Sequence, residues 1–171
     1  AVRCRTVPIR RRSPVRRHCW RPSPATGTRR LEDRIMLAET MPFPNILVKL
    51  STDPSPDVRR AVAHEDDRLA GGRLTKDEVP EVRDAALRNK RTSWKMRLEG
   101  AQNTDLDADT LDVLSRLGVS EESGAPAILA TMVRRAVALN PGTSQETLDR
   151  LRDDPSPEVA KAAASRTSDA S

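Results

Sequence analysis

Apolar residues recur along the chain in short helical stripes, and the stripes themselves repeat. The segment Asp53–Ala63, DPSPDVRRAVA, returns as Asp154–Ala164, DPSPEVAKAAA. A looser copy spans Asp77–Leu87, and Met132–Ala138 keeps the helix core without the proline lead-in. No stretch alternates apolar and polar residues over the length that a strand needs. The pattern therefore predicts an all-α chain of repeated units.

A valine anchors each copy of the repeat. The anchors are Val58, Val82, Val133 and Val159, separated by 24, 51 and 26 residues. These separations indicate a unit of about 25 residues. The middle gap should hold two units, with the missing anchor near Met96–Gly100. A short leucine-containing element precedes the anchored helices, because Asn140–Leu151 aligns without gaps on Asn103–Leu114 and Pro44–Leu50 is the earlier equivalent.

The proline-rich lead-in predicts where an anchored helix begins. Ser55 suits the N-cap, where a hydroxyl accepts a free backbone N–H. Pro56 suits the first helical position, whose N–H has no partner in any case. Val58, Ala61 and Val62 then fall at i, i+3 and i+4, on one face of the helix.

Each stripe of Val, Ala and Leu is too narrow for one unit to fold alone. Stacked units fold together, because neighbours shield one another's stripes from water. We therefore expect an all-α solenoid of about five units over residues 31–166. A flexible Arg- and Pro-rich arm, residues 1–30, precedes it, and a tail, residues 167–171, follows it.

The repeats resemble a known family of helical-repeat proteins. Asp53–Ala63 and Arg134–Leu148, RRAVALNPGTSQETL, resemble the variant leucine-rich repeat of bacteria, whose consensus reads like DPxxxVRxAVAxNPxTPxxxLxxL. The resemblance covers about residues 31–166. It implies alternating α- and 3₁₀-helices in a right-handed superhelix, and a binding scaffold without catalytic residues. At least one member of that family carries an iron–sulfur cluster on a Cys-rich segment, but this chain has only Cys4 and Cys19, so we expect no cofactor.

Charge is divided unevenly along the chain. The formal net charge is +5, but residues 1–30 hold ten arginines and no acid, which leaves the other residues at −5. Prolines and like charges predict a disordered arm. The arm can bind nucleic acid or another polyanion, act as a targeting segment, or have no specific role. Its candidate phosphate- or partner-binding residues are Arg10, Arg11, Arg12, Arg16 and Arg17.

A second set of arginines follows the anchors. Arg59, Arg83 and Arg134 each come directly after an anchor valine, and Arg97 is near the expected fourth position. Stacking places them on one side as a ladder, which predicts a basic stripe for phosphates or acidic partners. In the alternative, nearby Asp and Glu residues pair with these arginines, and the acidic body favours this second interpretation.

One unit is longer than the others. Met96 and Val133 are 37 residues apart, roughly 12 more than one unit. The extra segment, between Gly118 and Ala130, predicts an exposed loop, and insertions in repeat arrays often lie on the binding face. The candidate recognition residues in this loop are Glu121, Glu122 and Ser123.

No residue pattern predicts catalysis or a metal site. Asp105–Asp109 has the first three carboxylates of a calcium loop, but Thr110 and Arg116 stand where glycine and glutamate are needed. His64 has no accompanying nucleophile motif and suits the last turn of a helix. Gly71–Gly72 lacks the context of a phosphate loop and predicts a flexible connection.

These observations favour a non-catalytic, cytoplasmic scaffold that binds a macromolecule, with a protein favoured, along its superhelical surface. The alternatives are a nucleic-acid-binding protein that uses the arm and the arginine ladder, and an enzyme on a helical-repeat body. No apolar run approaches the roughly 18 residues of a membrane span, so no membrane contact is expected.

Overall fold

The computed structural model describes residues 30–41, 43–65 and 68–168. The candidate arginines of the arm lie outside these residues. The described chain forms ten helices: α1 (Leu31–Thr40), α2 (Pro44–Leu50), α3 (Pro56–His64), α4 (Arg68–Leu74), α5 (Pro80–Arg88), α6 (Trp94–Ala101), α7 (Ala108–Ser115), α8 (Ala127–Leu139), α9 (Gln145–Arg152) and α10 (Pro157–Ser168). The all-α prediction is confirmed, since these residues hold only an isolated bridge between Leu117 and Glu121 and no strand.

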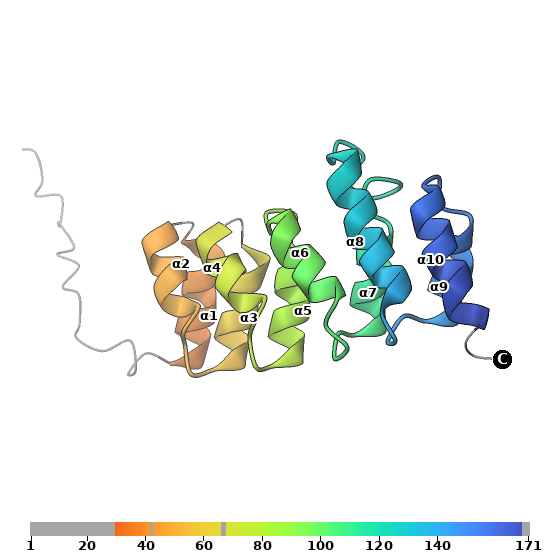
Figure 1. The fold of residues 1–171 in the computed structure, drawn as a ribbon. Coiled ribbons are helices and arrows are strands. Elements are labelled where there is room, and N and C mark those ends of the chain that lie inside the picture. The colour runs from red at the N-terminus through yellow and green to blue at the C-terminus, as the bar shows by residue number, and fades with distance from the viewer. Residues whose placement is uncertain (1–29, 42, 66–67, 169–171) are drawn as a thin grey trace, which may run out of the picture.

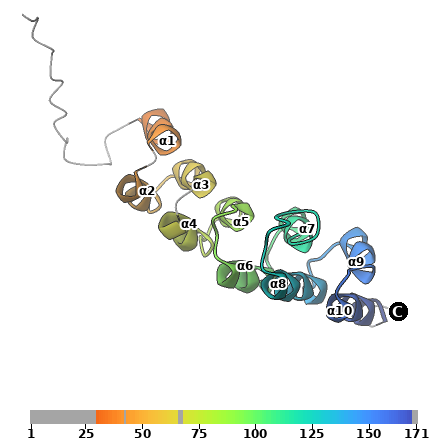
Figure 2. The same ribbon diagram turned by 90° about the horizontal axis from the view of Figure 1, so that it is seen from above.

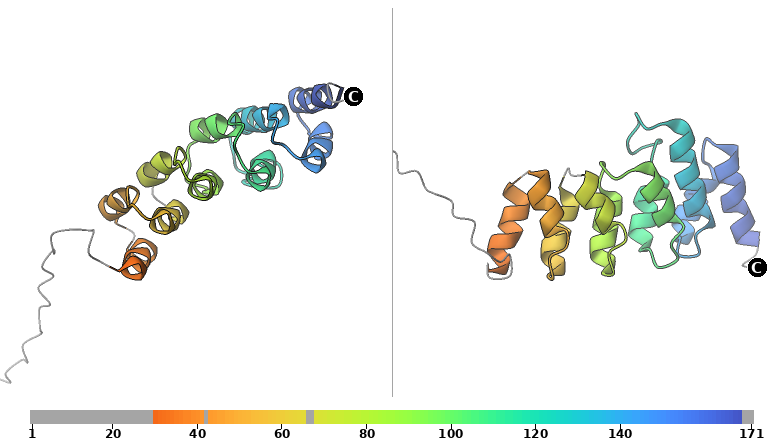
Figure 3. Two further views of the ribbon diagram at one scale, coloured as in Figure 1. Left: turned by 90° about the horizontal axis from the view of Figure 1, so that it is seen from below. Right: turned by 60° about the vertical axis from the view of Figure 1, so that its left-hand side comes forward.

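The helices stand in two rows that run the length of an elongated array (Figures 1 and 2). Row 1 contains α1, α3, α5, α7 and α9, and row 2 contains α2, α4, α6, α8 and α10, as the view from below also shows (Figure 3). The described helices therefore make five consecutive pairs. Each pair buries its stripes against the next.

The short elements are α-helical. The resemblance implied 3₁₀-helices, but the short helices of the described chain, α2, α4, α6, α7 and α9, are α-helices of seven or eight residues. Three of them carry a side-chain cap, in which Ser93, Asp107 or Ser144 accepts a backbone N–H of the first turn. Such a cap stabilises a full α-helical turn even in a short segment. The 3₁₀ prediction is wrong for these elements.

The valine-anchored helices change rows midway along the array. All four anchors are buried: Val58 on α3 and Val82 on α5 in row 1, and Val133 on α8 and Val159 on α10 in row 2. Met96 on α6 holds the missing anchor position, 14 residues after Val82 and 37 before Val133. Two anchored helices, α5 and α6, therefore follow each other directly. The expected division of this gap into two equal units is wrong.

The core divides at the same place. One cluster of buried apolar side chains runs from Ala38 on α1 to Ala86 on α5, and a second runs from Leu87 on α5 to Ala163 on α10. At the boundary α6 packs closely on α5, since a Cβ added at Gly100 would lie 2.6 Å from a methyl carbon of Leu87. This tight glycine contact lies inside the second cluster, directly beside the boundary.

Two local expectations need correction. Ser55 is the N-cap of α3 and Pro56 its first residue, as predicted, but the Ser55 hydroxyl makes no capping bond. The Asp53 carboxylate accepts the Ser55 backbone N–H instead, at 2.9 Å. The pair Gly71–Gly72 is not a flexible connection, because both glycines lie buried inside α4. A Cβ at Gly72 would lie 2.9 Å from the terminal methyl of Met96, so glycine leaves room for the Met96 side chain against α4.

Candidate partner-binding surface

The arginine after the anchor reaches forward to the next unit. Arg59 on α3 donates from Nε and Nη2 to the two carboxylate oxygens of Asp77, at 2.8 and 2.9 Å. Its Nη1 donates to the Asp53 carbonyl at 2.8 Å, in the loop before its own helix. Asp77 lies before α5 and also accepts the backbone N–H of Val79. One guanidinium therefore ties two successive lead-in loops together.

Three further pairs repeat this arrangement, which we call the arginine clamp: a guanidinium bound in two places to a carboxylate of the following loop. The pairs are Arg34 with Asp53, Arg97 with Glu122, and Arg134 with Asp154, at 2.7 to 3.2 Å. The final anchored helix, α10, carries Ala160 where the others carry arginine. Paired arginine–carboxylate contacts of this kind fix both distance and orientation.

Burial and hydrogen bonding both act on the clamp. Arg59 is 8% exposed, and the Asp77 hydrogen bond raises the pKa of its guanidinium above the usual value. Burial by itself would raise the pKa of Asp77, but hydrogen bonds from Arg59 and from the Val79 backbone hold it below its ordinary value. Both partners are thus held in their charged forms.

The predicted arginine ladder therefore holds repeats together. Arg59, Arg97 and Arg134 are 8%, 1% and 4% exposed and each is bound to a carboxylate. Their guanidinium groups do not face solvent, as a phosphate-binding stripe requires. The structure supports the alternative in which nearby acids pair with them. Arg83 is the exception, because among the described residues no carboxylate pairs with it.

The lengthened unit contains an exposed loop, and its three candidate residues differ in their surroundings. Glu121 and Ser123 are exposed. Glu122 is half-buried, has a positive φ of 47°, and binds Arg97 through both carboxylate oxygens. Glu122 thus supplies the clamp carboxylate of its unit, a role that the sequence analysis missed. Only Glu121 and Ser123 keep their side chains turned to solvent.

One helix, α8, exposes several large apolar residues. This helix has 13 residues and projects beyond its neighbours in row 2 (Figure 1). Ile128, Met132 and Leu139 are 77%, 45% and 48% exposed. They share a helical face with Arg135, since their spacing is i, i+4, i+7 and i+11. Exposed apolar residues gathered on one helical face mark an interaction surface more often than scattered single residues do.

A groove borders this face. It has a volume of about 450 Å³ and lies between α8 and α10. The lining residues are Arg135, Leu139, Glu158, Lys161, Ala162 and Ser165. We call the face and the groove together the α8 surface. The groove has apolar side chains bordered by the cations Arg135 and Lys161 and the anion Glu158. Such a surface is suited to a partner helix with an apolar stripe and acidic flanks.

Residues 132–156 match the sequence model of the family described as leucine rich repeat variant. The chain resembles that family over this segment. The matched segment contains the clamp pair Arg134 and Asp154, and it confirms the resemblance drawn from Arg134–Leu148. The other stretch that carries the resemblance, Asp53–Ala63, lies outside the match. No curated protein and no solved structure matches the chain.

The leucine rich repeat variant segment includes Met132 and Leu139 of the α8 surface but not Ile128 or the α10 residues. The resemblance therefore identifies the repeat, whereas the exposed apolar face extends beyond it. Within the described ranges, no helix combines the length and hydrophobicity of a membrane span.

His64 and the acids around it form a second groove. It lies between α3 and α5, has a volume of about 440 Å³, and is lined by Arg60, Glu81, Asp84 and Asp107 among others. Across the described residues, no hydrogen bond or ion pair joins His64 to a carboxylate, and no cluster of three His, Cys, Asp or Glu residues is placed to hold a metal. His64 lies in the last turn of α3, as predicted.

Proposed function

We propose that the chain is a non-catalytic helical-repeat scaffold that binds a partner protein at the α8 surface. The observation that carries the proposal is the exposed apolar face of Ile128, Met132 and Leu139 beside the α8–α10 groove. The clamps support it, because they hold the units in a fixed register without using the outer face of α8. The resemblance to the leucine rich repeat variant family over residues 132–156 agrees with a binding module.

The proposal includes the finer features that the resemblance implies. The two rows wind into a right-handed superhelix, and the protein acts in the cytoplasm. The partner presents an amphipathic helix, whose apolar stripe packs on Met132 and Leu139 while its acidic side chains approach Arg135 and Lys161.

The test compares partner capture by three forms of the full chain. Ile128→Glu combined with Met132→Glu places two charges on the α8 surface and should abolish capture of a protein that wild type retains. Asn45→Glu combined with Lys49→Gln is the matched control, since it makes the same change in net charge at exposed residues with the same i, i+4 spacing on α2, also in row 2. Equal capture by both double variants would place the binding face elsewhere.

A nucleic-acid-binding function is the second candidate, and it rests on the ten arginines of residues 1–30. With Arg59, Arg97 and Arg134 bound in clamps, the arm would supply most of the affinity. Binding should then fall steeply with salt and disappear on deletion of residues 1–30. Absence of binding to DNA and RNA at low salt would reject this candidate. An enzyme on this body is a third candidate, which the His64 groove would have to carry.

A further inference from the structure

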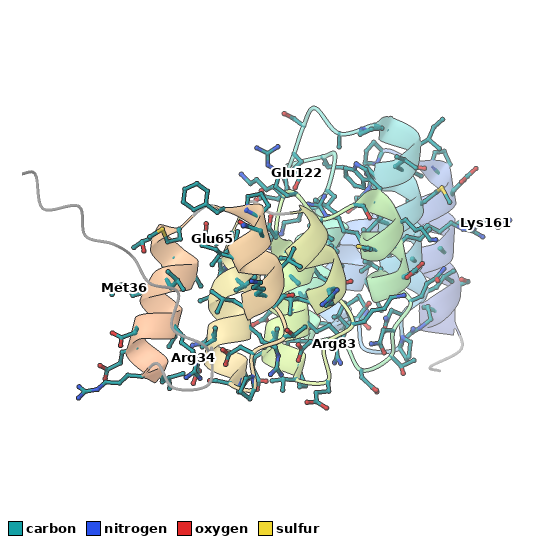
Figure 4. The ribbon with its side chains drawn as sticks, turned by 90° about the vertical axis from the view of Figure 1, so that its left-hand side faces the viewer. Arg34, Met36, Glu65, Arg83, Glu122 and Lys161 are labelled. Carbon is teal, nitrogen blue, oxygen red and sulfur yellow. The ribbon has the colours of Figure 1, made fainter. Side chains whose placement is uncertain are left out.

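Arg83 stands in the clamp position of α5 without a clamp carboxylate. Its Nη1 donates to the Asp77 carbonyl at 3.3 Å and its Nη2 to the Asp105 carbonyl at 3.2 Å. Its Nε is buried and has no hydrogen-bond partner. The two bonds use two of the five N–H groups of a guanidinium. Figure 4 labels Arg83 near the lower edge of the array, as it does Arg34, while Glu122 of a row 2 clamp lies near the upper edge.

Asn103 occupies the place where the missing carboxylate would stand. In three clamps the aspartate follows its arginine by 18 to 20 residues, and Asn103 follows Arg83 by 20. Its side-chain oxygen accepts the backbone N–H two residues on, at 3.1 Å, as the clamp aspartates do. The same turn therefore recurs at Asn103, but an amide replaces the acid. In the described part of the chain, no hydrogen bond joins Asn103 to Arg83.

The change of rows explains the substitution. The loop of Asn103 follows the anchored helix α6 and also leads into α7 of row 1. After the anchored helices α5 and α8, the equivalent residues Asn89 and Asn140 likewise accept the backbone N–H two residues on. The loop between α6 and α7 therefore carries the asparagine found after an anchored helix. It lacks the aspartate that a clamp would need in the loop before α7.

A pocket of about 280 Å³ opens at this place. It is lined by Thr75, Lys76, Asp77, Arg83, Met96, Glu99, Gly100 and Asn103. Arg59 binds Asp77, and Lys76 lies 3.1 Å from Glu99, so each of the two lining acids already has a cationic partner. Asp84, the next residue along the helix, attracts Arg83 through space but does not bind it in the described structure. Arg83 is left as the lining cation without an ion pair.

We propose that this pocket, the Arg83 pocket, binds a carboxylate supplied by another polypeptide, from an Asp or Glu side chain or from a C-terminus. The ligand carboxylate would bind Arg83 as Asp77 binds Arg59. Among the described clamp positions, Arg83 is the one where the chain has an amide, Asn103, in place of the carboxylate. A carboxylate suits the site better than a phosphate, because the nearby Asp77 and Glu99 repel a dianion more strongly. The inference does not depend on the α8 surface, which lies on other helices.

The test titrates two probes against the full ¹⁵N-labelled chain and follows the Nε–Hε resonance of Arg83, identified by its loss in Arg83→Gln. One probe is acetyl-Gly-Asp-Gly-amide, and the other is acetyl-Gly-Gly-Gly with a free C-terminus. We expect at least one to bind with a dissociation constant of about 1–10 mM, the range of a single charge-assisted contact. The neutral acetyl-Gly-Asn-Gly-amide should leave the resonance in place.

Asn103→Asp tests the same idea without removing the arginine. It restores the clamp carboxylate within the chain, so the carboxylate probe should bind at least about tenfold more weakly while the melting midpoint is unchanged or raised. Gln102→Glu is the matched control, since it adds the same charge at an exposed neighbouring position and should change affinity less than about twofold.

Three results would overturn the proposal: no shift of Arg83 at about 50 mM of either carboxylate probe, binding that Asn103→Asp leaves unchanged, or tighter binding of methyl phosphate than of both carboxylates. None of these results bears on partner capture at the α8 surface.

Discussion

Arg97 and Glu122 bind each other at 2.8 and 2.9 Å across the loop that lengthens their repeat. In three other clamps the acid is an aspartate 18 to 20 residues after the arginine, whereas here it is a glutamate 25 residues after it. The positive φ of Glu122 turns the loop, and the longer side chain spans the remaining distance. The lengthened unit thus keeps the inter-repeat contact although its sequence departs from the pattern.

The first prediction concerns this pair. Glu122→Gln should lower the free energy of unfolding by about 3 kcal/mol, because it leaves the buried Arg97 guanidinium without a counter-charge. Urea denaturation followed by circular dichroism measures the change. Glu121→Gln alters an exposed neighbour and should stay within about 0.5 kcal/mol of wild type. Similar midpoints for the two variants would show that Glu122 has no structural role.

The second prediction concerns the contact of α6 with Leu87 at the start of the second core cluster. Gly100→Ala should destabilise by about 1–3 kcal/mol, because its Cβ would lie 2.6 and 2.7 Å from the two methyl carbons of Leu87. Alanine's higher helix propensity, about 1 kcal/mol, offsets part of this cost. Gly124→Ala is the control, since nothing lies within 4 Å of its Cβ. A gain in the melting temperature of Gly100→Ala would contradict close packing of α5 on α6.

The third prediction concerns an anchor valine. Val58 has no exposed surface, so Val58→Asp places an unpaired charge in the first core cluster. We expect a loss of about 4 kcal/mol or more, or separation of the unit from its neighbours. Val119→Asp introduces the same residue at a position that is 49% exposed and should have little effect. A normal melting midpoint for Val58→Asp would mean that the anchor faces solvent.

The fourth prediction concerns pH. The pKa of Asp77 is lower in the folded chain than in the unfolded chain, so its clamp stabilises the fold above the ordinary Asp pKa of about 3.9. That contribution disappears as pH falls through the lowered folded value. The stability difference between wild type and Asp77→Asn should therefore be large at neutral pH and shrink on acidification. Urea midpoints measured between about pH 7 and pH 2 test this.

The exposed neighbour Glu78 provides the control for that series, because Glu78→Gln removes a nearby charge but leaves the Asp77 carboxylate and its hydrogen bonds in place. A gap between wild type and Asp77→Asn that stays constant with pH would show that hydrogen-bond geometry, and not charge, makes the clamp stabilising.

The periodicity of the sequence was sufficient to predict the valine-anchored helices and their buried anchors, but not α4, where Gly71–Gly72 was expected to be a flexible connection. Val58, Val82, Val133 and Val159 are all buried, because i, i+3, i+4 spacing depends only on the local geometry of a helix. The row change was not predictable in this way. The anchors Val82 and Met96 are only 14 residues apart. From residue spacing alone, Met96 is read as the anchor of one weak unit inside the 51-residue gap between Val82 and Val133.

The arginines illustrate what local patterns miss. Their position after each anchor was visible, but their partners lie 18 to 25 residues away, beyond the reach of helical periodicity. A signal did exist in the sequence. Asp53 and Asp154 stand two residues before the predicted N-caps, and Asp77 stands at the matching position of its own copy. An acid that recurs 18 to 20 residues after a recurring arginine indicates a contact between units.

The direct succession of α5 and α6 means that the array can be lengthened by a single helix, which is half of one helix pair. Either row can continue with a valine-anchored helix or with a leucine-containing helix. Inserting or losing one helix therefore moves every later anchored helix to the other row, while the two rows themselves continue. Duplication or loss of a single helix is thus enough to exchange the side chains that the far half of such a protein offers to its surroundings.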